Sequence, residues 1–200
     1  KKSIDGIPAV LSSLPIMMEE SYLTSCYGEN KLGSIASDLA KHGYATAFFH
    51  GGYNGTMNFD NYTKKIGFEH YYGKNEYNND ADYDGNWGIY DEPFLQYVVK
   101  QMDTISKPFV SALFTLSSHH PYSIPEQHIG RFPKGSMIVH ETVGYTDYAL
   151  KRFFEQAAKT KWYDNTLFII TSDHSALTSQ KEFKTQLGLF KIPMIVFHPQ

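Results

Sequence analysis

Residues 33–52, GSIASDLAKHGYATAFFHGG, combine a helix signal with a strand signal that follows it directly. Ser34 can cap a helix that runs to Lys41, and Gly43 can end that helix. The apolar run at 44–50 is typical of a buried strand. This part of the chain is therefore predicted to be a helix-to-strand unit.

The same order recurs twice further along the chain. A helix is predicted over residues 91–105 and is followed by the apolar run 109–116. Another helix is predicted over about 139–159, followed by the apolar runs 166–171 and 192–198. The residues expected on the inner faces of these two helices are Phe94, Leu95, Val98 and Met102 in the first, and Val143, Leu150, Phe153, Phe154 and Ala157 in the second.

Continuously apolar strands separated by amphipathic helices indicate an α/β fold in which a mostly parallel sheet is sandwiched between helices. In such sheets, ligands gather at the carboxyl ends of the strands. Polar clusters follow three of the predicted strands: HGGYNG after the first, SSHHPY after the second and SDHSA after the third. We expect these three clusters to meet at one edge of the sheet.

The composition of the chain excludes some classes of function. The chain has 200 residues with 42% hydrophobic and 20% charged residues, as one globular domain would, and its net charge is −3. This balance leaves no basic stripe, so we expect no nucleic-acid partner. Tyrosines in the long loop predicted at 75–86 are open to two interpretations, a carbohydrate or glycerol site and ordinary exposed loop residues. Cys26 is the only cysteine, which rules out an internal disulfide, and we expect it to be a small buried side chain.

No run approaches the roughly 20 apolar residues that a membrane-spanning helix needs, and nothing resembles a signal peptide. We therefore expect this segment to be soluble. The chain begins at KKSIDG and ends at FHPQ, inside what are predicted to be ordered elements. We accordingly expect it to be a piece of a longer protein.

Asp173 and His174 directly follow the apolar run that ends at residue 171. A carboxylate and an imidazole at a strand end are suitable ligands for a divalent metal ion. The alternative is that Asp173 caps the next segment and His174 is a polar surface residue. The pair alone does not decide between them.

Ser3 stands at the start of a helix-like stretch, beside Lys2. A hydroxyl at a helix N-terminus, near a cation and bound to a metal, would ionise more easily and could attack phosphorus or sulfur. Ser3 is therefore a candidate nucleophile. The alternative is that Ser3 is simply the N-cap of the helix.

His119 and His120 follow the second predicted strand, and we prefer His119 as the functional one. An imidazole could donate to a phosphoryl oxygen or protonate a leaving alkoxide, because histidine titrates near neutral pH. An exposed pair without a role is the alternative. His50 ends another strand and precedes Gly51 and Gly52, which permit close approach of a ligand, but this signal is weak by itself.

Taken in order, these pieces resemble the lipoteichoic acid synthase branch of the sulfatase and alkaline phosphatase superfamily. The matching motifs are KKS, KHGYATAFFHGG, WGIYDEPF, FTLSSHHPY, GYTDYALKRFF, TLFIITSDH and IPMIVFHP. The resemblance covers nearly the whole chain, and SDH and YTDYAL are its more specific elements. It implies the alkaline phosphatase-type α/β sandwich and an enzyme that transfers or hydrolyses a phosphoryl-linked head group, phosphoglycerol or similar, from a lipid donor.

The resemblance also implies roles for particular residues. Ser3 falls on the nucleophile, which also binds the metal, while Asp173 and His174 fall on metal ligands. His119 falls on a histidine that contacts the substrate, and His50 and Trp87 are implied to bind substrate as well. The metal would be manganese or magnesium, and a covalent phospho-enzyme would be resolved by a second alcohol or by water.

Two departures from the family pattern are visible. Phosphoglycerol transferases carry a Trp and an Arg that hold the phosphate, and Met57 and Phe59 stand at those positions. The family's remaining acidic metal ligand would lie before Lys1. We therefore expect residues 1–200 to be the central part of one catalytic domain, without its first strand and its C-terminal part, and expect this piece to bind metal poorly and to be inactive by itself.

Four other functions stay open. A sulfatase needs a C/S-x-P/A-x-R signature, which the residues after Ser3 do not provide. A phosphoethanolamine transferase and a phosphodiesterase are not distinguished by the sequence. A non-catalytic domain that binds glycan through its tyrosine-rich loops is the alternative of another class. The resemblance further implies a complete protein that is anchored in the membrane and acts on its extracytoplasmic face, in the periplasm or outside the cell, on a lipid-linked or glycan substrate.

Overall fold

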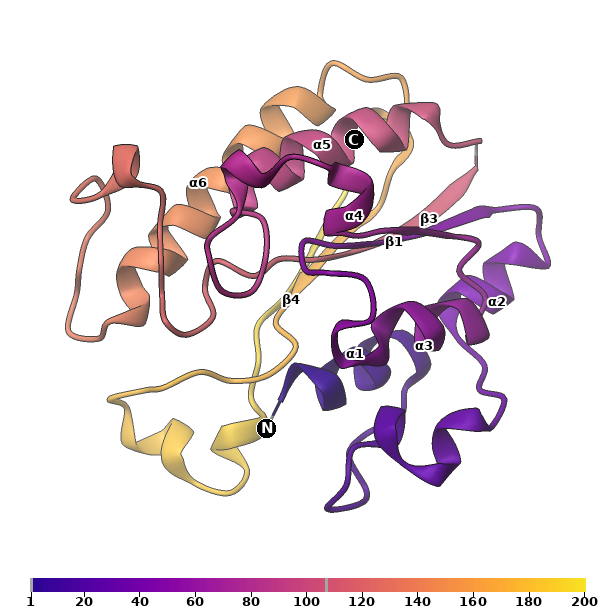
Figure 1. Ribbon diagram of the computed structural model, residues 1–200, viewed down its shortest axis with the longest axis horizontal. Coiled ribbons are helices and arrows are strands. Elements are labelled where there is room, and N and C mark those ends of the chain that lie inside the picture. The colour runs from indigo at the N-terminus through magenta and orange to yellow at the C-terminus, as the bar shows by residue number, and fades with distance from the viewer. Residues whose placement is uncertain (1, 107) are drawn as a thin grey trace.

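The apolar run after Gly43 forms β1, which is the middle strand of a three-stranded parallel sheet in the order β2-β1-β3. A computed structural model describes residues 2–106 and 108–200 of the chain (Figure 1). Neighbouring strands are parallel because helices carry the chain back between them. The strands of this sheet are β1 (Ala45–His50), β2 (His70–Tyr72) and β3 (Phe109–Phe114).

Helices cover both faces of this sheet, as Figure 1 shows. One face carries α5 and α6, which pack against each other, and the other carries the three helices α1, α2 and α3. The bounds are α1 (Ser3–Ser12), α2 (Ile35–Ala40), α3 (Phe59–Lys65), α4 (Lys74–Tyr77), α5 (Asp91–Thr104) and α6 (Val139–Ala157). The predicted α/β sandwich with a mostly parallel sheet is confirmed.

Successive side chains of β1 point to opposite faces of the sheet and contribute to the hydrophobic core on both faces. Ala47 and Phe49 point toward α5 and α6, whereas Phe48 points toward α1, α2 and α3. The Phe49 ring stacks on Tyr72 of β2 with 4.8 Å between the ring centroids. Since all three β1 side chains are at most 1% exposed, this strand fixes the two layers of helices relative to each other.

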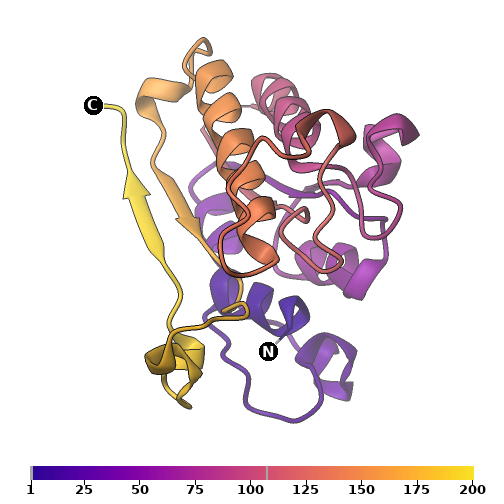
Figure 2. The ribbon, with the colours of Figure 1, turned by 90° about the vertical axis from the view of Figure 1, so that its left-hand side faces the viewer.

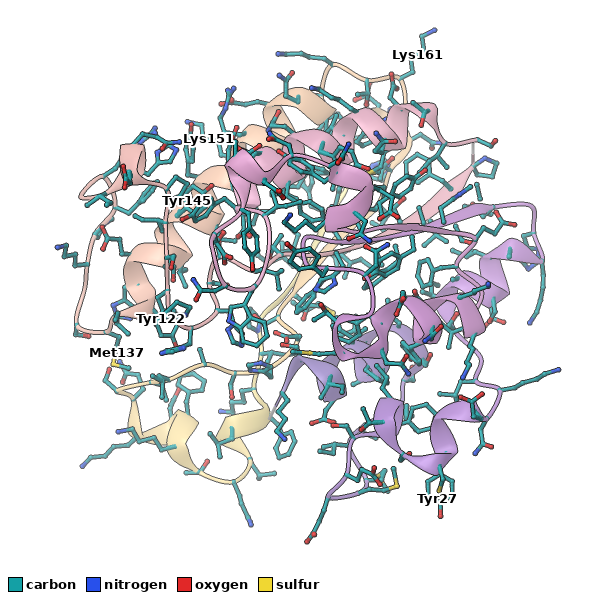
Figure 3. All side chains as sticks on the ribbon, viewed as in Figure 1. Tyr27, Tyr122, Met137, Tyr145, Lys151 and Lys161 are labelled. Atoms are coloured by element: carbon teal, nitrogen blue, oxygen red, sulfur yellow. The ribbon has the colours of Figure 1, made fainter. Side chains whose placement is uncertain are left out.

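The inner face of α6 differs from the sequence prediction. Val143 is 51% exposed, so its assignment to the core was wrong. The fully buried stripe instead passes through Tyr145, whose hydroxyl accepts the backbone N–H of Glu92 at 3.2 Å (Tyr145 is labelled in Figure 3). A tyrosine with a buried hydrogen-bond partner counts as polar in a hydropathy pattern, and this shifted the predicted stripe. The buried residues of α6 are Val139, Thr142, Tyr145, Ala149, Phe153 and Ala157.

Two further expectations are corrected. The predicted loop at 75–86 includes most of the short helix α4 and a 3-10 turn at Asp80–Asp82, so it is partly ordered into helix. Cys26 is exposed, not buried. It begins a short 3-10 helix at the surface, beside Tyr27, which projects outward at the lower edge of Figure 3. None of the residues in this short 3-10 helix is buried.

The last two predicted strands form a second sheet. β4 (Phe168–Thr171) and β5 (Met194–Phe197) pair in antiparallel fashion, and Figure 2 shows them beside α6 at one side of the molecule. Their side chains are unusually exposed, 61% at Ile169 and 69% at Met194. Within the described residues, no helix combines the length and the apolar character that crossing a membrane requires.

Candidate active site

Ser3 is the first residue of α1 and is only 5% exposed. Lys2, not Ser3, occupies the N-cap position, and it makes no side-chain capping bond. The alternative in which Ser3 merely caps the helix is therefore not what the structure shows. At this end of α1, backbone N–H groups lack partners within the helix and the helix dipole is positive, which favours a negatively charged oxygen.

Asp173 and His174 lie in the turn that follows β4. The Nδ1 atom of His174 is 2.9 Å from the carbonyl oxygen of Ser175. Because a carbonyl can only accept, Nδ1 is the donor in this contact. The other ring nitrogen, Nε2, lies 3.4 Å from Oδ2 of Asp173, a buried oxygen that has no hydrogen-bond partner among the described residues.

His119 lies in the turn after β3. Its Nδ1 donates to the carbonyl of the next residue, His120, at 2.7 Å. The indole N–H of Trp87 donates to the same carbonyl at 2.7 Å, and the Trp87 ring contacts the His119 ring edge-on with centroids 4.5 Å apart. This arrangement uses Nδ1 of His119 and leaves Nε2 for a ligand.

One open pocket of about 500 Å³ brings three of these groups together. Ser3, His119 and His174 all line it, although they come from α1, from the turn after β3 and from the turn after β4. Asp173 does not line this pocket itself, and its side chain is 19% exposed. The described residues that line the pocket are Lys2, Ser3, Ile4, Glu19, Glu20, Ser21, Thr24, Met57, His119 and His174.

His50 and Trp87, the other predicted substrate contacts, do not line this pocket. His50 is 1% exposed, and its Nδ1 lies 3.1 Å from the Tyr71 hydroxyl. Burial lowers the pKa of His50 to about 4, so the ring is neutral at neutral pH. Trp87 does not line the pocket but contacts His119, which does. Substrate binding by His50 and Trp87 stays a prediction.

The two departures from the family pattern have different surroundings. Met57 lines the pocket, whereas Phe59 is fully buried, with its ring 5.3 Å from that of His50. Among the described lining residues, Lys2 is the only Lys or Arg. Glu19 and Glu20 also line the pocket and were missed, because the segment after α1 carries no motif or periodicity that could have indicated them.

The residues present fit a divalent metal ion. The buried Oδ2 of Asp173, the Nε2 of His174 that faces it and the hydroxyl of Ser3 are an oxygen and nitrogen donor set of the kind that such ions prefer. Residues 2–106 and 108–200 contain no group of three or more His, Cys, Asp and Glu side chains that could hold a metal ion. These three residues therefore supply only part of a full coordination shell.

A second, smaller hollow of about 290 Å³ lies between the start of α5 and α6. Tyr90, Glu92, His128 and Tyr145 are among its lining residues. None of the candidate catalytic or metal-binding residues faces it. The candidate active site is therefore the larger pocket at the N-terminus of α1.

The fold places the chain in the alkaline phosphatase superfamily. A protein of that superfamily from Vibrio parahaemolyticus superposes with a TM-score of 0.85, at 29% identity, over 99% of this chain and 49% of that one. The sequence model of the sulfatase family matches residues 3–200, so the chain belongs to the sulfatase family.

Within the family, the similarity is to the lipoteichoic acid synthase branch, as the sequence motifs predicted. Lipoteichoic acid synthase 1 of Bacillus subtilis is 29% identical over 157 residues, which are 76% of this chain and 25% of that protein. The structure of the lipoteichoic acid synthase LtaP from Listeria monocytogenes matches with a TM-score of 0.82 and 20% identity, over 98% of this chain and 53% of that one. The chain thus spans about a quarter of the length of the curated relative and about half of these solved structures.

Proposed function

We propose that the complete protein transfers a phosphoryl-linked head group from a lipid donor to an alcohol, through a covalent intermediate on Ser3. The observation that carries this proposal is the meeting of Ser3, His119 and His174 in one pocket. A nucleophile, a proton carrier and a metal ligand from three distant segments are the parts that such a reaction needs. The kinship with lipoteichoic acid synthases supports phosphorus as the reacting atom.

Ser3 acts as the nucleophile. Its oxygen forms a bond to phosphorus while the bond from phosphorus to the lipid alcohol breaks, and the Ser3 proton is released. In the second half, an acceptor alcohol or water forms a bond to phosphorus and the bond to Ser3 breaks. The positive end of α1 stabilises negative charge on the Ser3 oxygen and on the phosphoryl group.

His119 handles the proton in both halves. With Nδ1 held by the His120 carbonyl, only Nε2 faces a ligand, so the ring delivers a proton to the departing alkoxide or removes one from the acceptor through that atom. The edge contact with Trp87 keeps the ring from turning.

Ser3, Asp173 and His174 would hold the divalent ion, manganese or magnesium. Such an ion would lower the pKa of the Ser3 hydroxyl and offset charge on the phosphoryl oxygens. Asp173 and His174 meet the chemical requirement because one offers a buried carboxylate oxygen without a hydrogen bond and the other offers an imidazole nitrogen, Nε2, 3.4 Å from that oxygen. The rest of the shell would come from the complete protein, in which residues 1–200 are the central part of the catalytic domain.

Lys2 replaces the Arg of the family's phosphate clamp. The position of that Arg is taken by Phe59, whose ring is in the core, so the cation for the phosphate must come from elsewhere. Lys2 lines the pocket beside Ser3. As a flexible point charge, it can pair with a phosphate oxygen without the fixed two-bond geometry of an arginine.

Phosphoethanolamine transfer is the second candidate, favoured by Glu19 and Glu20. These two carboxylates line the same pocket as Lys2. A head group with a phosphate at one end and an ammonium at the other would match charges of both signs. Phosphoglycerol has no positive group to pair with the glutamates, so the donor preference discriminates between the two head groups.

The kinship with lipoteichoic acid synthases supports a complete protein that is anchored in the membrane, with its catalytic domain on the extracytoplasmic face. There it would meet lipid donors and glycan or lipid-linked acceptors. A sulfatase and a non-catalytic glycan-binding domain are less well supported. The formylglycine signature is absent after Ser3, and a non-catalytic domain would have no need to keep Ser3, His119 and His174 in one pocket.

The test is to incubate the complete protein, in manganese-containing buffer, with phosphatidylglycerol or with phosphatidylethanolamine. Mass spectrometry of the peptide that contains Ser3 should find the donor's head group, and the matched variant Ser3→Ala should carry none and form no product. A variant Ser12→Ala, at the far end of α1, is the control and should behave as wild type. Full turnover by Ser3→Ala would overturn the proposal.

The metal is tested separately by calorimetry. Manganese should bind the complete wild-type protein, and both Asp173→Asn and His174→Gln should weaken that binding by about 10- to 100-fold or more, as loss of a ligand does. Asp164→Asn, in the exposed turn before β4, should leave the affinity unchanged. Unchanged affinity in Asp173→Asn and His174→Gln would mean that the ion binds elsewhere.

A further inference from the structure

Asp91, the first residue of α5, is completely buried where α5, α6 and the turn after β3 meet. Its Oδ1 accepts the backbone N–H groups of Leu116 at 3.0 Å and Ser117 at 2.9 Å, and its Oδ2 accepts the hydroxyl of Thr146 at 2.7 Å. In return, the backbone N–H of Asp91 donates to the Ser117 hydroxyl at 2.9 Å. Three segments far apart in sequence are thus tied to one carboxylate.

The hydrogen bonds continue from this junction to His119. Leu116, whose N–H is held by Asp91, accepts the N–H of His119 on its own carbonyl at 3.0 Å. The carbonyl of His119 in turn accepts the N–H of Tyr122 at 2.7 Å. The turn that carries the imidazole is therefore closed on itself, and its first peptide groups are fixed to α5.

Trp87 holds the same turn from its outer side. It belongs to the segment WGIYD that ends at Asp91, and its indole N–H donates to the carbonyl of His120. Its own backbone N–H is bound by Asp84 Oδ1 at 2.8 Å. The segment from Trp87 to Asp91 is thus hydrogen-bonded to the turn at two places, residues 116–117 and residue 120.

Burying the polar side chain of Asp91 does not by itself stabilise the fold. Burial raises the pKa of this carboxyl, and the hydrogen bonds from Ser117, Thr146 and Leu116 lower it only in part. A well-packed apolar side chain at such a position often gives equal or greater stability than a buried charge. A carboxylate here supplies directional acceptors for the N–H groups at the start of the His119 turn, which an apolar side chain does not.

We propose that Asp91 is a positioning residue, which sets the orientation of the His119 imidazole in the pocket by hydrogen bonding to the N–H groups of Leu116 and Ser117. It is not a catalytic residue, because it is enclosed between α5 and α6 and does not line the pocket. The inference rests on the proposed function, in which His119 carries the proton. In this proposal, the orientation of His119 depends on the ability of residue 91 to accept hydrogen bonds, and not on its negative charge.

Three variants of the complete protein test this. Asp91→Ala removes every acceptor and should lower kcat about 100-fold, with KM changed less than about 3-fold, as a misplaced catalytic group does. Asp91→Asn keeps one oxygen for both N–H groups, and its amide can donate to Thr146, so kcat should stay within about 5-fold of wild type. Met102→Ala, in the core on the same helix, controls for instability and should keep its kcat at a temperature where all variants are folded.

Two results would overturn the positioning role. One is a kcat of Asp91→Ala within about 3-fold of wild type or no lower than that of Met102→Ala at matched stability. The other is an Asp91→Asn variant as impaired as Asp91→Ala, because this would make the charge, and not the hydrogen bonds, the cause.

Nitrogen NMR of histidine-labelled complete protein gives a readout that needs no turnover. The His119 signal, assigned with His119→Gln, should report a proton fixed on Nδ1 in wild type and in Asp91→Asn, and mixed tautomers in Asp91→Ala. If wild type shows this tautomer but transfers no head group, the proposed function fails while the positioning of His119 stands. An identical His119 signal in wild type and Asp91→Ala would refute the positioning role even if transfer is observed.

Discussion

Gly6 of α1 lies directly against the main chain of Asp173, so that a Cβ atom added at Gly6 would come within 2.3 Å of the Asp173 carbonyl oxygen. The helix that carries Ser3 and the turn that carries two candidate metal ligands are therefore packed backbone to backbone. This contact needs a residue without a side chain. It sets the separation between Ser3, the proposed nucleophile, and the proposed metal ligands Asp173 and His174.

Gly6→Ala should accordingly push α1 away from the Asp173 turn. We expect a loss of about 1–3 kcal/mol in stability from overpacking and a fall in transfer activity of about 100-fold from a displacement near 1 Å. Thermal unfolding and single-turnover assays on the complete protein measure the two effects. Gly33→Ala, where an added Cβ meets nothing within 4 Å, is the matched control, and equal behaviour of the two variants would exclude this role for Gly6.

Lys2→Met should lower kcat/KM for a phospholipid donor by about 10- to 100-fold, the usual effect of losing a charge-assisted hydrogen bond to phosphate. Lys2→Arg should keep most of the activity because it keeps the charge. Steady-state kinetics with a labelled donor give the ratio. The control is Lys41→Met, which removes an exposed lysine paired with Asp38; a Lys2→Met enzyme as active as this control would remove Lys2 from the phosphate site.

The stability of the protein should depend on His50 in a defined pH range. Its folded-state pKa of about 4 lies below the ordinary histidine pKa of 6.5, so the unfolded chain binds an additional proton between these two values. The contribution of His50 is fully present above pH 6.5 and is lost as the pH falls toward 4, by about 3 kcal/mol in total. Urea unfolding of wild type and His50→Gln across this range should give a shallower pH slope for the variant. Parallel slopes would contradict the prediction.

Phe49→Ala should destabilise the fold by about 3–5 kcal/mol, because it leaves a cavity between β1 and the α5 and α6 layer. Phe49 is 0% exposed and stacks on Tyr72. Tyr27→Ala removes a ring that is 53% exposed and should change stability by less than about 0.5 kcal/mol. Chemical denaturation gives both values, and a small effect of Phe49→Ala would mean that the core repacks around the gap.

The sequence predicted the architecture well because the strongest signals in it are local. Ser34 caps α2 with a capping box, as its position predicted. The helix predicted at 91–105 is α5, and all four of its predicted inner residues are buried. These outcomes depend on contacts within a few residues and on periodicity, which a single sequence displays directly.

Predictions failed where burial depends on distant partners. Val143 is exposed while Tyr145 is buried, because the Tyr145 hydroxyl finds the N–H of Glu92 on another helix. Cys26 is at the surface because it begins a short 3-10 helix that buries none of its residues, although nearby Leu23 packs into the core. Glu19 and Glu20 carry no motif, and only the path of the chain around the N-terminus of α1 places them at the pocket.

By itself, the sequence determined the α/β class, the family and the candidate residues Ser3, His119, Asp173 and His174, since each stands beside a strand or helix end that local patterns reveal. Only the tertiary structure decided that Ser3, His119 and His174 share one pocket, that His50 is enclosed in the core and that Asp91 ties the His119 turn to α5. The physical reason is that these relationships join segments tens to more than a hundred residues apart. Packing and buried hydrogen bonds between such segments leave no periodic trace in a single chain.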